Sequence, residues 1–271
     1  MLVIGNGRLV TRDPAVPFYE NGAVAMDGGT IVRVGTAEDV RREFPEAEYI
    51  DARGGVIMPA FINTHEHIYS AMARGLSING YNPNGFLEIL DGMWWTIDRH
   101  LTNEQTRQSA RATYIDSIKN GVTTVFDHHA SFGEIHDSLF AIEDAAKELG
   151  IRTCLCYEVS DRDGMDKAKE AVMENAAWIK HALADDTDMI AGMMGMHAQF
   201  TISDATMELA AANKPAEVGY HIHVAEGIED LHDCLKKYGK RIVDRLYDCN
   251  ILGSKTLLGH CIYVNPHEME L

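Results

Sequence analysis

The stretch "GGVIMPAFINTHEHIYSAMARG", residues 54–75, runs an apolar segment directly into His65, Glu66 and His67. Alternate side chains of an extended backbone point to the same side, so the imidazoles of His65 and His67 share one face. A strand end that places two nitrogen ligands side by side is a favourable start for a metal site. The pattern alone also fits a pair in which one histidine packs and the other is exposed.

From Val56 onward the sequence alternates apolar segments with segments of helical character. Thr102 can cap a helix together with Gln105, and Asn120-Gly121 would end that helix. Repeated β-α units of this kind imply a parallel sheet with helices outside it. Strands are predicted within residues 54–67, 122–129, 151–159, 189–200, 218–226 and 256–264, and helices within 102–120, 134–150, 165–181, 203–212 and 228–248.

Residues 1–55 show only short strand patterns. Asp27-Gly28-Gly29 supplies the positive φ that a tight hairpin turn requires, and a second strand pair is predicted around residues 52–55. We therefore expect a small β-layer over residues 1–55. Residues 56–271 are predicted to form an α/β fold, a (β/α)8 barrel of which about six strands are present.

The polar residues of the predicted barrel fall at the ends of its strands. Barrel enzymes build their sites at the carboxyl ends of strands, so these side chains are expected to converge. No G-x-G-x-x-G or G-x-x-x-x-G-K-[ST] motif follows any strand, which disfavours an open nucleotide-binding sheet. The residues at the strand ends are His65, His67, Asp127, His128, His129, His197, His223, Glu226 and His260.

Three of these histidines suit a single divalent cation. We predict that His65, His67 and His223 bind one metal ion, with Zn²⁺ favoured over Fe²⁺. Such an ion lowers the pKa of its water to about 7. Glu226, three residues beyond His223, can move the proton of that water to a leaving group, and His260 can orient the water or stabilise charge.

Neighbouring histidines leave alternatives open at two of the strands. His221 lies on the same strand face as His223, and the nearby Glu226 favours His223 as the ligand. His128 and His129 point to opposite faces of their strand, so at most one of them can enter the site. A structural role is favoured for both.

Two further side chains are predicted to contact a small-molecule substrate. His197 is the first, although a core histidine with satisfied hydrogen bonds is the competing interpretation. Trp94 is the second, as one wall of a heteroaromatic pocket, although simple packing would also explain a tryptophan there.

Composition narrows the class of partner. The formal net charge is −17, with 24 basic and 41 acidic residues, which argues against a nucleic-acid partner. No apolar run approaches the roughly 20 residues of a membrane span, and the N-terminus shows no secretory signal pattern. The five cysteines are odd in number and contain no C-x-x-C motif, which favours reduced thiols in the cytoplasm. A homo-oligomer is compatible with all of these features.

Five motifs together resemble the amidohydrolase superfamily. They are the opening stretch 54–75 and the segments "NGVTTVFDHH", "GMHAQF", "HIHVAEG" and "LLGHC". Within it the sequence looks like the cytosine deaminase and triazine/S-adenosylhomocysteine aminohydrolase group, and "NGYNPNGFLEILDGMWW" is similar to the aminohydrolases called SsnA. The resemblance implies a (β/α)8 metal-dependent hydrolase barrel over residues 56–271 and a β-sandwich built from both chain ends, of which residues 1–55 form the N-terminal part. It further implies hydrolytic deamination of an amino-substituted heteroaromatic ring. It also implies the metal, proton-transfer and substrate roles given above.

The resemblance implies, in addition, an aspartate ligand after an eighth strand. The sequence ends at Leu271, shortly after the sixth predicted strand, so we expect the last two β-α units and the returning part of the sandwich to be absent. Two alternatives follow for function. One is an inactive or weakly metal-binding fragment, and the other is a hydrolase of C–Cl or other C–N bonds that uses the same site.

Overall fold

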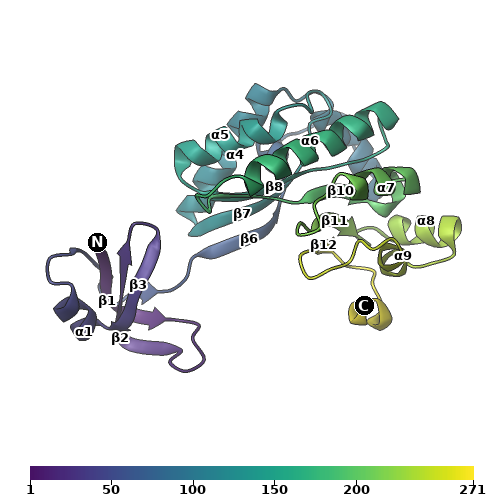
Figure 1. Ribbon diagram of the computed structural model, residues 1–271. Coiled ribbons are helices and arrows are strands. Elements are labelled where there is room, and N and C mark those ends of the chain that lie inside the picture. The colour runs from purple at the N-terminus through teal and green to yellow at the C-terminus, as the bar shows by residue number, and fades with distance from the viewer. The chain divides into compact units, whose positions relative to one another are not determined.

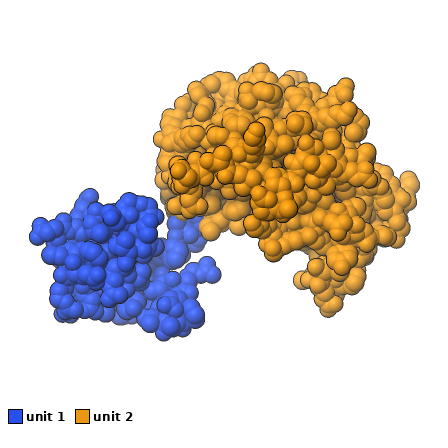
Figure 2. Space-filling view, in the orientation of Figure 1, with its two compact units in different colours: residues 1–61 blue, residues 62–271 orange.

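The computed structural model describes residues 1–271, which divide into two compact units (Figures 1 and 2). Unit 1 comprises Met1–Phe61 and unit 2 comprises Ile62–Leu271. The assignment of residues 1–55 to part of a β-sandwich stays a prediction. None of the helices combines the length and the apolar character needed to cross a bilayer.

Unit 1 is built on one five-stranded sheet. Its order is β3-β2-β1-β4, with β5 also paired to β1. The predicted hairpin is confirmed, because β2 and β3 pair antiparallel across Gly28, whose φ of 55° is the left-handed value that glycine adopts freely. The elements are β1 (Leu2–Val10), β2 (Phe18–Asp27), β3 (Thr30–Thr36), α1 (Ala37–Glu43), β4 (Glu48–Asp51) and β5 (Val56–Ile57).

The strand pair predicted around residues 52–55 is wrong. Strands β4 and β5 do not pair with each other; each runs parallel to β1, at Leu2–Gly5 and at Arg8–Leu9 respectively. The expected single buried strand over 54–67 is also wrong, because Pro59 separates β5 from β6 (Phe61–Glu66). Phe61 and Ile62 are more than half exposed, and β6 lies at one edge of its sheet.

Unit 2 alternates strand and helix as predicted, and its strands form two sheets. One has the order β6-β7-β8-β9 and the other β10-β11-β12, so the barrel is not closed. The single strand expected within 189–200 is wrong, because it divides into two strands that belong to different sheets. An isolated parallel bridge between Val159 and Met196 links the two sheets. The strands are β7 (Val122–His129), β8 (Arg152–Tyr157), β9 (Ile190–Gly192), β10 (Met194–Ala198), β11 (Tyr220–Val224) and β12 (Leu257–His260).

Helices cover the outer side of these strands, and α4, α5 and α6 lie together against β6–β8 (Figure 1). Helix α4 (Asn103–Lys119) begins at the predicted capping box of Thr102 and Gln105, and α7 (Asp204–Ala212) at the Ser203 cap. The helix expected over 228–248 is two helices, because Gly239 ends the first in a left-handed conformation. The remaining helices are α5 (Ser138–Leu149), α6 (Met165–Leu183), α8 (Ile228–Tyr238), α9 (Ile242–Asp248) and α10 (Pro266–Glu270).

A helical segment between β6 and α4 has an irregular backbone. Helix α2 (Phe86–Ile89) passes through a π-helical turn, η2 (Leu90–Trp94), into α3 (Trp95–Asp98), and a short 3₁₀ helix, η1 (Ile68–Ala73), follows β6 directly. A π turn adds a residue to the helical repeat and so re-aims the side chains beyond it. Here Trp94 is the last residue of the π turn and Trp95 is the first residue beyond it.

Candidate metal centre and pocket

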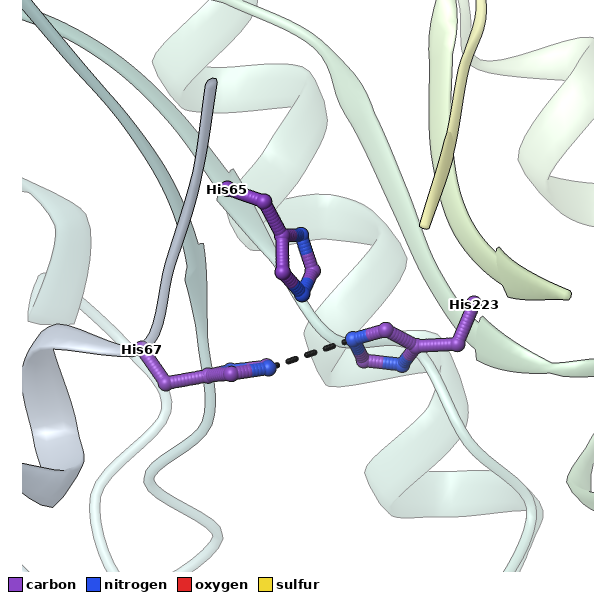
Figure 3. A group of neighbouring side chains, drawn as sticks. All are labelled: His65, His67 and His223. Atoms are coloured by element: carbon purple, nitrogen blue, oxygen red, sulfur yellow. Dashed lines mark hydrogen bonds between the residues drawn. The ribbon is translucent and has the colours of Figure 1, made fainter. Parts of the chain in front are cut away.

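The carboxyl ends of β6 and β11 bring the three predicted metal ligands together (Figure 3). The ring of His65 lies 4.9 Å from that of His67 and 5.0 Å from that of His223, measured between ring centroids. One candidate ligand atom from each side chain lies within 4.8 Å of the others. Residues 156 positions apart therefore share one small volume, as the strand-end rule predicts.

Hydrogen bonds fix which nitrogen of His67 faces this volume. Its Nδ1 lies 2.8 Å from the main-chain carbonyl of His128. A carbonyl only accepts, so Nδ1 carries the proton and Nε2 of the neutral ring keeps its lone pair. That Nε2 lies 3.2 Å from Nε2 of His223.

The ring of His65 is oriented by a buried chain of donors. Cys156 donates from Sγ to the carbonyl of Asp127 at 3.3 Å, and Nδ1 of His221 lies 3.6 Å from that sulfur. His221 can therefore donate from Nδ1 and accept at Nε2, which lies 2.8 Å from Nδ1 of His65. The other ring nitrogen of His65, Nε2, keeps its lone pair and takes no part in this series of hydrogen bonds. His221, the alternative to His223 in the sequence, thus contacts the predicted ligand His65.

The three rings meet the requirements of a divalent ion. Nε2 of His65 is buried and has no hydrogen-bond partner in the protein. Burial and neighbouring histidines lower the pKa of His65 to about 3 and that of His67 to about 4, and they lower the pKa of His223 well below its ordinary value. All three rings are neutral at pH 7, which is the form that binds metal. Neutral imidazoles in this arrangement suit Zn²⁺ or Fe²⁺.

Glu226 reaches the same volume through a strained turn after β11. Ala225 has a φ of 50°, the left-handed region, and Asp230 accepts a hydrogen bond from its main-chain nitrogen at 3.0 Å. Burial, with Glu158 and Asp230 nearby, raises the pKa of Glu226 to about 7. Its Oε2 lies 3.5 Å from Nε2 of His260. A carboxyl group with this pKa can both accept and return a proton near neutrality.

Strand β12 approaches the histidines closely at Gly259. A Cβ atom at this position would lie 3.2 Å from Cδ2 of His223 and 3.4 Å from Cε1 of His65. The absence of a side chain lets the strand pass beside the rings. His260, the next residue, then stacks on His223 with 5.3 Å between ring centroids.

A cavity of about 310 Å³ opens onto these groups. That size suits a small ligand. Both predicted substrate contacts line it: His197 comes from β10, and Trp94 from the π turn. Trp95, Phe86 and Leu90 add apolar walls.

The two remaining strand-end histidines are fully buried and differ in position. His128 lies against the metal candidates, 4.3 Å from His223 between ring centroids. His129 is turned the other way and lies 3.0 Å from the Ser131 hydroxyl. The expectation that at most one enters the site is met by His128. Glu158, directly after β8, also lines the cavity and was missed, although its place at a strand end was a usable signal.

Comparison with known proteins agrees with this geometry. The model of the amidohydrolase family matches residues 56–271, so the chain belongs to the amidohydrolase family. A second model, the imidazolonepropionase-like composite domain of bacteria, matches residues 22–47.

Individual relatives have low sequence identity to this chain. The 5'-deoxyadenosine deaminase of Methanococcoides burtonii is 27% identical over all of this chain and 59% of its own length. The 5-methylthioadenosine/S-adenosylhomocysteine deaminase of Bacillus cytotoxicus is 24% identical over 96% of this chain and 58% of its own. The chain thus spans about three-fifths of these curated relatives. Atrazine chlorohydrolase TrzN from Arthrobacter aurescens TC1, solved with zinc, superimposes with a TM-score of 0.80 at 24% identity, covering 99% of this chain and 62% of its own.

Proposed function

We propose that this protein is a metal-dependent aminohydrolase that removes ammonia from an amino-substituted heteroaromatic ring. The observation that carries the proposal is the convergence of three neutral imidazoles and one carboxyl group with a pKa of about 7 on a single cavity. The deaminase names of the two curated relatives support it. The finer resemblance to the SsnA aminohydrolases stays a prediction.

In this proposal His65, His67 and His223 hold one divalent ion, with zinc favoured. The TrzN structure contains zinc, and the neutral histidine nitrogens suit that metal. A divalent ion in such a site supplies Lewis acidity, which makes hydroxide available at neutral pH.

Side chains of the protein carry out the remaining steps of the proposed reaction. Glu226 accepts the proton of the attacking water and delivers it to the amine nitrogen as the C–N bond breaks, so that ring amine and water become ring carbonyl and ammonia. His260, 3.5 Å from the carboxylate of Glu226, orients the water. His197 and Trp94 contact the ring of the substrate.

Ammonia release tests the proposal directly. The zinc-loaded protein is assayed with aminopurines, aminopyrimidines and aminotriazines, and chloride release from chlorotriazines is followed in parallel. We expect ammonia from at least one amine, and none from a His223→Ala variant. Chloride without ammonia would favour the C–Cl hydrolase alternative. If no substrate releases ammonia or chloride, and each chain holds less than one tightly bound ion, the alternative of an inactive or weakly metal-binding fragment would be favoured.

A further inference from the structure

The turn that carries Glu226 contains a residue in an unfavourable backbone conformation. Ala225 lies between β11 and Glu226, and its φ of 50° is in the left-handed region. A residue with a Cβ atom stays in this region only where surrounding contacts hold it there. Ala225 is 1% exposed, so water cannot supply those contacts. The direction of the Glu226 side chain therefore depends on the protein groups that bind this turn.

Asp230 binds the turn at two points. Its Oδ2 accepts a hydrogen bond from the main-chain nitrogen of Ala225 at 3.0 Å, and its own main-chain nitrogen donates to the carbonyl of Gly227 at 3.2 Å. Glu226 lies between these two bonded residues. Asp230 is 2% exposed, and it does not line the cavity. Its carboxyl group can therefore affect a reaction only through the turn.

Gln199 fixes the orientation of the Asp230 carboxyl group. It begins the short 3₁₀ helix η3 (Gln199–Thr201), directly after β10. Its Nε2 donates to Oδ1 of Asp230 at 3.0 Å and to the main-chain carbonyl of the same residue at 2.9 Å. Nη1 of Arg245 donates to Oε1 of Gln199 at 3.0 Å, which determines the end of the amide that faces Asp230. The two oxygens of Asp230 thus have separate donors in the protein.

The guanidinium of Arg245 is itself held in place. Arg245 is 3% exposed, and Cζ lies 3.7 Å from the ring centroid of Tyr238. Its Nη2 donates to Oδ1 of Asp204 at 2.6 Å. Arg245 belongs to α9, Tyr238 to α8 and Asp204 to α7. Three helices therefore fix the group that orients Gln199.

The chain after β12 is bound to the same turn. The main-chain nitrogen of Tyr263 donates to the carbonyl of Ala225 at 3.1 Å. His260 also has a left-handed φ, of 66°. The distance of 3.5 Å between Oε2 of Glu226 and Nε2 of His260 is thus set by two turns that are hydrogen-bonded to each other.

We infer that Asp230 is a positioning residue for the proposed proton transfer, because it holds the turn that places Glu226 opposite His260. The role of Glu226 as proton carrier rests on the proposed function, whereas the hydrogen bonds of Asp230 do not depend on it. Misplacing a reacting group by about 1 Å can cost about 100-fold in rate. Loss of the Asp230 carboxyl group should therefore slow the chemical step more than it weakens substrate binding, since the residue does not line the cavity.

Kinetics and crystal structures of the zinc-loaded Asp230→Ala variant test the inference. Ammonia release is measured for each aminopurine, aminopyrimidine or aminotriazine that the unmodified protein hydrolyses. We expect kcat to fall about 10- to 100-fold, KM to stay within about threefold, and zinc content to stay constant. The crystal structure of the variant should show the Glu226 carboxyl group displaced from His260 by about 1 Å or more relative to the unmodified protein.

Matched variants separate positioning from a general effect on folding. Asp230→Asn keeps one acceptor oxygen for the main-chain nitrogen of Ala225 and should recover part of the kcat lost in Asp230→Ala. Asp233→Ala changes an aspartate of the same helix that lies 3.3 Å from Nε2 of Gln199 and pairs with Lys237. Because Asp233 does not bind the turn, this variant should leave kcat unchanged. If Asp230→Ala does not fold, Asp230→Leu decides, because leucine keeps the size of the side chain without its acceptor oxygens.

The outcomes distinguish this inference from the proposed reaction. A lower melting temperature with unchanged kcat and an unchanged distance between Glu226 and His260 would limit Asp230 to a role in folding and overturn the inference. Equal losses of kcat in Asp230→Ala and Asp233→Ala would also overturn it. If no amine releases ammonia from the unmodified protein, the proposed reaction fails, and the displacement of Glu226 in the crystal structures alone decides whether Asp230 positions the turn.

Discussion

Replacing His221 by leucine should weaken zinc binding although His221 is not a predicted ligand. The ring accepts the 2.8 Å hydrogen bond from Nδ1 of His65, and it is 1% exposed, so water cannot replace it. Without this acceptor His65 loses the bond that fixes its tautomer and ring orientation. Removing an outer partner of this kind typically costs 10- to 100-fold in metal affinity, or about 1.4–2.7 kcal/mol.

Zinc competition against a chromophoric chelator measures this affinity. His221→Gln is the matched variant, because its side-chain carbonyl can accept from His65 at nearly the same place, and it should retain most of the affinity. His181→Leu, which changes a half-exposed histidine paired with Glu143, serves as the distant control. Unchanged zinc affinity in His221→Leu would refute the orienting role. Equal losses in the leucine and glutamine variants would show that packing, rather than the hydrogen bond, is what the site needs.

Three further substitutions test other parts of the structure. Glu226→Gln should lower the rate of ammonia release by about 10²–10⁴-fold while zinc content stays constant, and a variant with full activity would exclude Glu226 as the proton carrier. Asp98→Ala should lower the free energy of unfolding in urea by about 1.5–3 kcal/mol, since it removes the acceptor of two hydrogen bonds from the buried Arg162, whereas the exposed Asp186→Ala should change little. Burial raises the pKa of Glu174, so the folded protein holds this proton more tightly and the stability contributed by Glu174 falls as pH rises above about 4.5. The stability of Glu174→Gln relative to the unmodified protein should therefore increase from pH 4.5 to pH 7 in urea titrations; a constant difference would contradict the shift.

Local signals in the sequence were sufficient for most elements of unit 2. The cap at Thr102 and the cap at Ser203 depend on side chains two or three residues from the groups they bind, so the sequence carries the whole interaction. The end of the helix at Gly239 was equally local and could have been predicted from a glycine that follows the basic residues Lys236 and Lys237. Strand ends were the most useful signal, because parallel strands place their carboxyl ends at one edge whatever connects them.

Features that depend on distant partners were not predictable in the same way. Strands β4 and β5 look like a hairpin in the sequence, but both pair with β1, more than forty residues earlier. The orientation of His65 depends on a chain through His221 and Cys156, and the sequence cannot place these side chains end to end. Glu158 is different, because it directly follows β8 and the strand-end rule would have included it.

The two pocket carboxylates have pKa values displaced in opposite directions, and this difference separates the chemistry that each can perform. Burial beside other carboxylates raises the pKa of Glu226 to about 7, whereas His197, His128 and Arg162 outweigh burial at Glu158 and lower its pKa to about 2. A group that titrates near neutrality can carry a proton through a reaction cycle; a group ionised at every working pH can only attract and orient. Exchanging the two environments would exchange the roles. An Arg162→Met substitution should accordingly raise the pKa of Glu158, while leaving proton transfer by Glu226 intact.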